Sequence, residues 1–241
     1  MWTVGVAPSF ASPKSNTFSK AYVRSSEVTS PLPNYLIVPP EYQALRCLPA
    51  DQFIPDLMKR LDLPYYAGLL SAAQYHGAAH HRPQEFQVCL AKNRRPMQCG
   101  AVRVVFIVRK RIPEIPVQPF NTPRGTILVS TPEATALDLV GYAHHVGGLD
   151  NAATVLSELA EKLDPEKLSV AARAAPIPWV QRLGYILELV GSSDKTAPLK
   201  AYVHQHSKHT AALLASASRK RSRPNRDWKL YINAAIDVES L

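Results

Sequence analysis

Residues 126–140 read TILVSTPEATALDLV, and the change from strand to helix inside this stretch decides the fold. The first four residues are mostly apolar or β-branched, as is typical of a strand. The hydroxyl groups of Ser130 and Thr131 can cap a helix. Pro132 is tolerated in the first helical turn, and Glu133 suits the positive end of a helix. Because apolar residues continue at helical spacing, the sequence predicts a strand followed at once by a helix.

Further strand-like segments lie upstream of this point. Segments 86–90 and 102–108 are short, rich in β-branched or aromatic residues and separated by proline or glycine. The second reads VRVVFIV, which is mostly apolar, as expected of a strand covered on both faces. An amphipathic helix is predicted to begin at Asp51, and a second, apolar helix is predicted over residues 65–75.

Downstream of residue 140 the pattern is mainly helical. We expect helices over 150–163, after Asp164, and over 178–190, and then a late strand over 228–232. Strands followed by helices, with one returning strand, indicate an α/β fold, either mixed or α+β. The predicted architecture is a central sheet of short strands with a C-terminal group of helices.

Composition excludes several classes of protein. The 241 residues are 46% hydrophobic and 20% charged, which is ordinary for a folded domain and excludes wholesale disorder. The chain contains no G-x-G, no G-x-x-x-x-G-K-[ST] and no G-x-S-x-G sequence, which argues against a dinucleotide enzyme, a P-loop enzyme and a serine hydrolase. We therefore expect no cofactor. The excess of 28 basic over 19 acidic side chains, +9, favours an anionic partner such as nucleic acid.

The expected location is the cytoplasm. Cys47, Cys89 and Cys99 are odd in number and lack C-x-x-C spacing, which fits a reducing compartment better than a disulfide framework or a zinc knuckle. No uncharged apolar run approaches the ~18 residues that a membrane-spanning helix needs, so we expect no membrane partner.

Two groups of residues suggest metal chemistry, and both are weak. His76 and His80 have the spacing of helical zinc ligands, but Gly77 replaces the glutamate that zinc proteases use as a base. Asp227 and Lys229 alternate on a predicted strand as in a metal-dependent nuclease, with Asp138 as a third group. The nuclease is kept as an alternative. Our main prediction is no catalytic residue and no metal site.

The basic side chains form three clusters, and we predict that they gather on one surface that neutralises DNA phosphates. One cluster lies between two predicted strands, one follows the strand over 102–108, and the densest precedes Trp228. The predicted DNA-binding residues are Lys92, Arg94, Arg95, Arg109, Lys110, Arg111, Arg219, Lys220, Arg221, Arg223 and Arg226.

Five stretches, taken together and in this order, resemble the AbiEi family of antitoxins from type IV toxin–antitoxin systems. They are 63–73 (LPYYAGLLSAA), 130–139 (STPEATALDL), 147–153 (GGLDNAA), 181–185 (QRLGY) and 228–233 (WKLYIN).

The resemblance implies a non-enzymatic antitoxin and transcriptional regulator of a bacterial abortive-infection system. Its partners would be the promoter DNA of its own operon and a nucleotidyltransferase toxin, which such antitoxins oppose without a stable complex. It also implies a winged helix-turn-helix domain before Tyr35, for which residues 1–33 offer no pattern. We therefore expect residues 1–34 to be a disordered or remnant arm and residues 35–241 to be the AbiEi-like C-terminal antitoxin domain. A truncated, non-functional relic is the remaining alternative.

Overall fold

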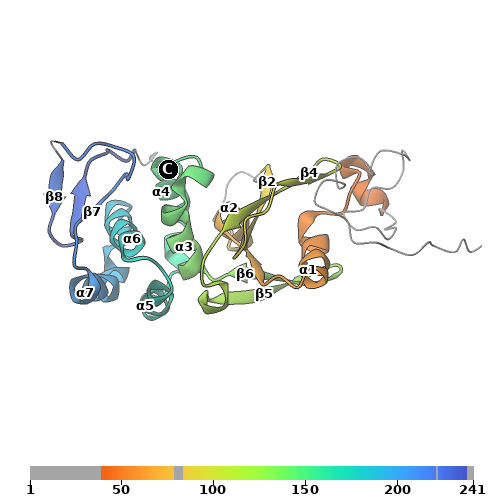
Figure 1. The fold of residues 1–241 in the computed structure, drawn as a ribbon. Coiled ribbons are helices and arrows are strands. Elements are labelled where there is room, and N and C mark those ends of the chain that lie inside the picture. The colour runs from red at the N-terminus through yellow and green to blue at the C-terminus, as the bar shows by residue number, and fades with distance from the viewer. Residues whose placement is uncertain (1–38, 79–83, 221, 238–241) are drawn as a thin grey trace, which may run out of the picture.

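The computed structural model describes residues 39–78, 84–220 and 222–237. A six-stranded sheet lies at one end of the molecule, a three-stranded sheet at the other, and a group of helices between them (Figure 1). The α-helices are α1 (Ala50–Arg60), α2 (Leu69–Tyr75), α3 (Pro132–Gly141), α4 (Leu149–Leu159), α5 (Pro165–Arg173), α6 (Ile177–Leu189) and α7 (Ala197–His206). The strands are β1 (Tyr65–Ala67), β2 (Glu85–Leu90), β3 (Met97–Cys99), β4 (Val102–Val108), β5 (Val117–Thr122), β6 (Gly125–Ser130), β7 (Ala211–Ala212), β8 (Arg223–Asn225) and β9 (Leu230–Ile232). The predicted α/β fold with a sheet of short strands and C-terminal helices is confirmed.

The larger sheet has the order β3-β4-β2-β1-β6-β5 and is mixed. β2 runs parallel to β4, and β1 runs parallel to β6 but antiparallel to β2. The strands predicted over 86–90, 102–108 and 126–129 are confirmed as β2, β4 and β6. β3 and β5 form the two edges of the sheet. They were not predicted because they bear more polar residues than the other strands, and β5 also contains a proline.

The helix predicted over residues 65–75 is wrong in its first half. Residues 65–67 form β1, which lies between β2 and β6, and Tyr66 and Ala67 are fully buried there. Gly68 then makes the change from strand to helix in close contact with the buried thiol of Cys89, where a Cβ would come within 2.7 Å of the sulfur. A short apolar run is compatible with either a helix or a buried strand. Here the pairing with β2 and β6 determines that it is a strand.

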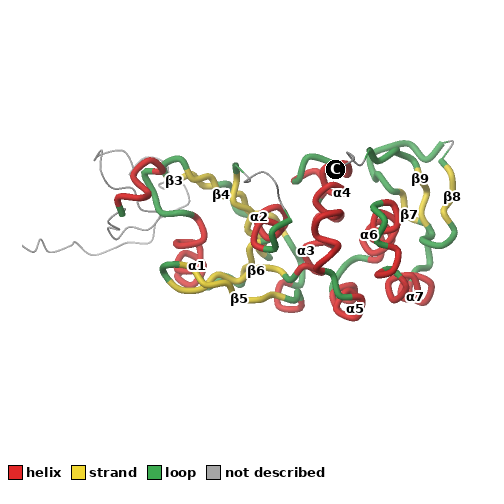
Figure 2. Tube along the Cα trace, turned by 180° about the vertical axis from the view of Figure 1, so that it is seen from behind, coloured by secondary structure: helices red, strands yellow, loops and turns green. Residues whose placement is uncertain are grey.

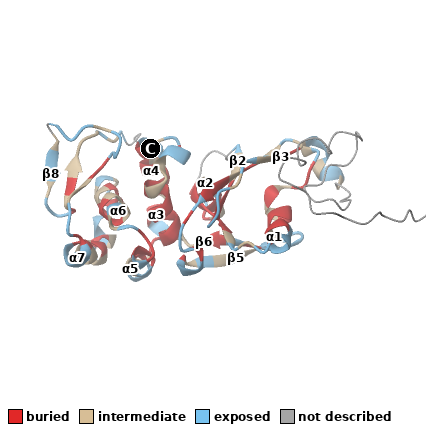
Figure 3. Ribbon diagram, viewed as in Figure 1, coloured by how far each residue is buried: buried red, intermediate tan, exposed pale blue. Residues whose placement is uncertain are grey.

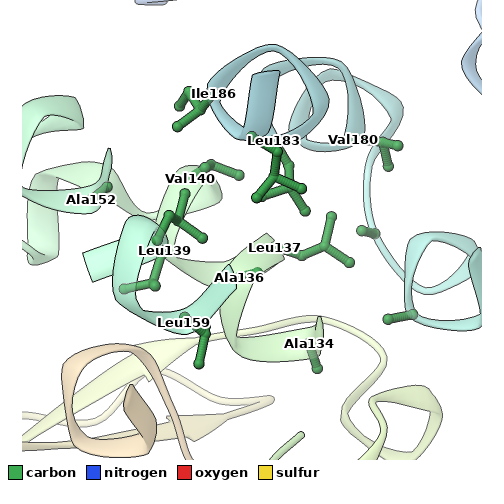
Figure 4. Close-up of a cluster of buried hydrophobic side chains, with 14 of the residues drawn as sticks. Ala134, Ala136, Leu137, Leu139, Val140, Ala152, Leu159, Val180, Leu183 and Ile186 are labelled. Atoms are coloured by element: carbon green, nitrogen blue, oxygen red, sulfur yellow. The ribbon is translucent and has the colours of Figure 1, made fainter. Parts of the chain in front are cut away.

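The predicted helix start after β6 is confirmed. The Thr131 hydroxyl accepts a hydrogen bond from the Ala134 amide at 3.4 Å, and Pro132 is the first residue of α3. Nearly the whole of α3 is buried (Figure 3) because the sheet, α4, α5 and α6 surround it. Its leucines meet Leu183 and Ile186 of α6 in the main core (Figure 4).

The C-terminal part confirms the predicted helices and adds α7. Asp164 caps α5 by accepting hydrogen bonds from two backbone amides, and α6 stops before Gly191, whose φ is +84°. The segment over 197–206 is too polar to show a clear apolar face, so α7 was not predicted. The late strand begins at Leu230, not at Trp228, because residues 226–229 form a turn.

The sequence favoured reduced cysteines over a disulfide framework, and for two of the three cysteines this is wrong. Cys47 and Cys99 form a disulfide with 5.8 Å between their Cα atoms, across 52 residues of sequence. The segment before α1 folds onto the turn between β3 and β4, and this contact cannot be read from cysteine spacing. Cys89 is free and buried, and burial raises the pKa of its thiol well above the ordinary value. In the described ranges no helix is both long and apolar enough to cross a membrane.

Candidate nucleic-acid interface

Two of the three basic clusters meet at one edge of the larger sheet. Parallel pairing places Leu90, the last residue of β2, opposite Val108, the last residue of β4. The Arg109 amide also donates a hydrogen bond to the Leu90 carbonyl at 2.7 Å. Because the carboxyl ends of parallel strands share an edge, the segments that begin at residues 91 and 109 leave the sheet side by side.

Arg109 itself is not available to DNA, and its assignment as a phosphate contact is wrong. The residue is only 4% exposed. Its Nε donates to Oδ1 of Asp138 at 3.1 Å, and one terminal amino group donates to the Ala174 carbonyl at 3.0 Å. The guanidinium group also lies 4.7 Å from the ring centre of Trp179. Because these contacts neutralise the guanidinium group and occupy its hydrogen-bond donors, Arg109 cannot contact a DNA phosphate.

The buried ion pair joins the sheet to the helices. Asp138 lies on α3, and its Oδ2 accepts a 2.6 Å hydrogen bond from the hydroxyl of Tyr66 on β1. Burial raises the pKa of the Asp138 carboxyl, whereas Arg109 and the Tyr66 hydroxyl both act to lower it. Since each charged or polar group satisfies another, this cluster has the properties of a structural junction.

The remaining basic side chains of these two segments differ in how free they are. Lys92, Arg95 and Lys110 are exposed. Arg94 lies over the ring of Phe106 at 5.5 Å, which orders its guanidinium group without neutralising it. Arg111 is paired with Glu114 through two hydrogen bonds. Four cations at this edge form no ion pair with an acidic side chain of the described residues. We call them the sheet-edge cluster: Lys92, Arg94, Arg95 and Lys110.

The third basic cluster lies at the other end of the molecule. Arg219, Lys220, Arg223 and Arg226 surround β8 in the three-stranded sheet, and the group of helices separates them from β2 and β4 (Figures 1 and 2). All four are exposed, and within the described ranges no carboxylate pairs with them. We call them the β8 cluster. Arg221 lies outside the described residues.

The basic residues therefore form two separate cationic regions and not the single surface predicted from the sequence. The reason is topological. The chain forms a second, small sheet that carries the last cluster away from the first two.

The predicted nuclease arrangement is not present. Asp227 and Lys229 lie in the turn before β9, not on a strand, so the alternation that would align them is absent. Asp227 pairs with Lys200 at 3.2 Å, and Lys229 donates to the Ser207 carbonyl at 2.7 Å. Asp138 is enclosed in the junction described above. Trp228, between the two turn residues, is fully buried against Gly184.

The structure does not support a metal site at His76 and His80. α2 ends at Tyr75, Gly77 has a φ of +68°, and the buried His76 ring lies 2.7 Å from the Ser130 carbonyl, to which it donates from Nε2. His80 and His81 lie outside the described residues. In the described part of the chain no three His, Cys, Asp or Glu side chains are grouped to hold a metal ion.

Sequence reasoning missed one basic group. Arg182 on α6 and Lys208 after α7 line the same cavity beside β7 as Arg219 does. Their signal was weak because each is a single cation in an apolar or polar stretch. The start of α6 at Ile177 was the available clue, since its first turn contains no acidic residue.

Comparison with known proteins identifies a family and shows a related fold among solved structures. Residues 66–189 match the AbiEi antitoxin C-terminal domain. The fold is similar to the crystal structure of the Rv2827c protein from Mycobacterium tuberculosis, with a TM-score of 0.54 and 17% identity over 76% of this chain and 68% of that chain. No curated protein matches the chain. At this identity the structural likeness concerns the fold alone.

Proposed function

The chain belongs to the AbiEi antitoxin C-terminal domain family, and from this premise we propose that it is an antitoxin that opposes a nucleotidyltransferase toxin and binds DNA through exposed basic side chains. Its role is regulatory and not enzymatic. The domain match over residues 66–189 is the single observation that carries the antitoxin role. It includes the junction of Tyr66, Arg109 and Asp138, so the matched region holds the contacts that join sheet to helices.

DNA binding is supported by exposed cations that form no ion pair with a carboxylate of the described residues. The sheet-edge cluster and the β8 cluster contribute eight of them, all at least partly exposed. Phosphate contacts of this kind release counterions and position a protein on a duplex, but they do not read sequence. Within this proposal the described residues supply affinity for the promoter of the protein's own operon, and autoregulation follows from occupancy of that promoter.

The antitoxin role is tested by co-expression in bacteria with a nucleotidyltransferase toxin encoded beside an antitoxin of this family. We expect the full chain to restore growth. Asp138→Ala, which disrupts the junction, should lose the rescue together with soluble protein. Arg111→Ala is the matched control, since this exposed side chain forms its ion pair with the nearby Glu114 and not with the junction. Persistent toxicity at normal levels of folded protein would refute the antitoxin role.

Physical association with the toxin is the second arm of that test. We propose that protection does not require a stable complex. Purified chain and toxin should therefore elute separately in size-exclusion chromatography while co-expression still protects. Co-elution as one species would contradict this part of the proposal and leave the antitoxin role intact.

A further inference from the structure

A cavity of about 480 Å³ opens where the start of α6 meets the segment between α7 and β7. A volume of this size lies within the range of small-molecule sites in proteins. Gln181 lines it, and the side-chain amide of this residue donates to the Ser207 hydroxyl and to the backbone carbonyls of His209 and Lys229. These bonds tie the segment that carries Lys208 to α6, so the cavity is built into the fold.

The charged groups that line this cavity are all cationic. Arg182, Lys208 and Arg219 contribute guanidinium and ammonium groups, and His206 and His209 add two imidazoles. No acidic side chain from the described part of the chain lines it. The second large cavity, beside α1, is different, because Asp51 and Glu85 line it together with Arg103. Of these two cavities, the one at α6 has a lining whose charged groups are all basic.

Arg182 is the most informative of these cations. It is half-buried on α6, and among the described residues its side chain has one hydrogen-bond partner, the Ala212 carbonyl, 3.0 Å from Nε. Its terminal amino groups therefore keep their donors, and no carboxylate in the described ranges forms an ion pair with it. Removing a cation from water without a counter-ion is costly, so this arrangement favours the binding of an anion.

Helix α6 adds to the positive field. It spans 13 residues, and its first residues, Ile177 and Pro178, line the cavity. No side chain caps its first turn and no acidic residue lies there. The positive end of the helix dipole is therefore uncompensated at the point where the cations converge.

Apolar residues form much of the remaining lining, beside the polar Ser207 and Thr210. Ala211, Ala212 and Ala215 form part of the wall with Ile177 and Pro178. At the exposed side His206 stacks on Tyr202 with 4.2 Å between ring centres and 28° between ring planes. A flat ring of this kind can extend a stack to a nucleobase.

We propose that this cavity binds a nucleoside polyphosphate, with the phosphates at Arg182, Lys208 and Arg219 and the base against the apolar wall and His206. The volume exceeds the need of a phosphate ion, and the three cations neutralise most of the negative charge of a triphosphate. This assignment goes beyond the antitoxin role. The cavity shares Arg219 with the β8 cluster, whereas Arg182, Lys208 and Ala215 belong to neither exposed cluster, so variants at these three positions test nucleotide binding separately from DNA binding.

The direct test is isothermal titration calorimetry of the full chain with ATP and with GTP, in EDTA so that no metal neutralises the phosphates. We expect saturable 1:1 binding of at least one of them. Adenosine and guanosine lack the charge and inorganic phosphate lacks the base, so each should bind at least tenfold more weakly. Absence of saturable binding of both nucleotides at millimolar concentration overturns the proposal. Phosphate binding as tightly as the nucleotides overturns the assignment to a nucleotide.

Three exposed positions separate the cavity from general surface charge. Lys208→Glu reverses a lining cation and should weaken binding at least fivefold. Lys220→Glu is the matched control, because Lys220 is an exposed neighbour of Arg219 that does not line the cavity, and it should change affinity less than twofold. Ala215→Trp keeps every charge but fills the cavity, so it should also weaken binding at least fivefold. Equal losses for Lys208→Glu and Lys220→Glu, or unchanged affinity in Ala215→Trp, would overturn the proposal.

Discussion

Arg109 is buried and Arg182 is half-buried, and the two have opposite surroundings. At the junction of sheet and helices, Arg109 forms an ion pair with the carboxylate of Asp138, which neutralises its charge. On α6, Arg182 donates to the Ala212 carbonyl, forms no ion pair with a carboxylate of the described residues and lies beside a cavity. The comparison teaches that the acidic partner decides whether a basic residue stabilises the fold or is available to a ligand. The number and the position of basic residues in the sequence do not determine which of these two roles a given residue has.

The largest expected effect is at the junction. Asp138→Ala leaves the Arg109 cation buried and unpaired, so it should lower the free energy of unfolding by about 3–5 kcal/mol. Urea denaturation followed by circular dichroism measures this. The double variant Arg109→Met with Asp138→Leu should recover much of the loss, because replacing both members of a buried pair with apolar residues is tolerated. A loss below about 1 kcal/mol in the single variant would show that the pair is not a buried structural contact.

A smaller effect comes from His76, another buried polar group of the sheet half. Burial lowers the pKa of His76 below its ordinary value of 6.5. The folded chain therefore binds fewer protons at this residue than the unfolded chain, and its contribution is intact above pH 6.5 and lost as pH falls below that value. The loss approaches about 1.4 kcal/mol per pH unit.

The comparison that isolates this effect is His76→Gln against the natural sequence. Burial also lowers the pKa of His145, so both proteins should become less stable in acid. The unfolding free energy of His76→Gln, measured from pH 8 to pH 5, should fall less steeply than that of the natural chain. Parallel curves would mean that His76 titrates alike in the folded and unfolded states.

Arg182 should give the smallest change in stability. Arg182→Met keeps the aliphatic part of the side chain and removes one hydrogen bond, so we expect a loss of about 1 kcal/mol or less in urea denaturation. Removal of a cation without a counter-ion also relieves a desolvation cost, which opposes that loss. A loss as large as that of Asp138→Ala would contradict the contrast between the two arginines.

The parts of the fold that local sequence controls were predictable. The strand, cap and helix of residues 126–140 follow from adjacent residues, and so do the stops at proline and glycine. Tertiary pairing decided the rest: residues 65–67 join β2 and β6 as a strand, and Cys47 reaches Cys99 across 52 residues.

The candidate site shows the same limit. Arg109, Lys110 and Arg111 are consecutive and alike in sequence, but one is buried, one is exposed and one is paired with Glu114. The carboxylate that neutralises Arg109 lies 29 residues away on another element, so no local pattern separates the three. The second sheet also divides the predicted basic surface in two, since its position depends on how α6 and α7 pack.

The affinity for duplex DNA as a function of salt concentration tests the central claim that unpaired, exposed cations carry nucleic-acid binding. The natural chain is compared with one variant carrying glutamine at all four positions of the β8 cluster and one carrying glutamine at all four of the sheet-edge cluster. We predict that log K falls linearly with log salt for the natural chain, and that each lost phosphate contact makes the slope shallower by about 0.9. Affinity that does not change with salt, or slopes that stay the same in both variants, would contradict the account.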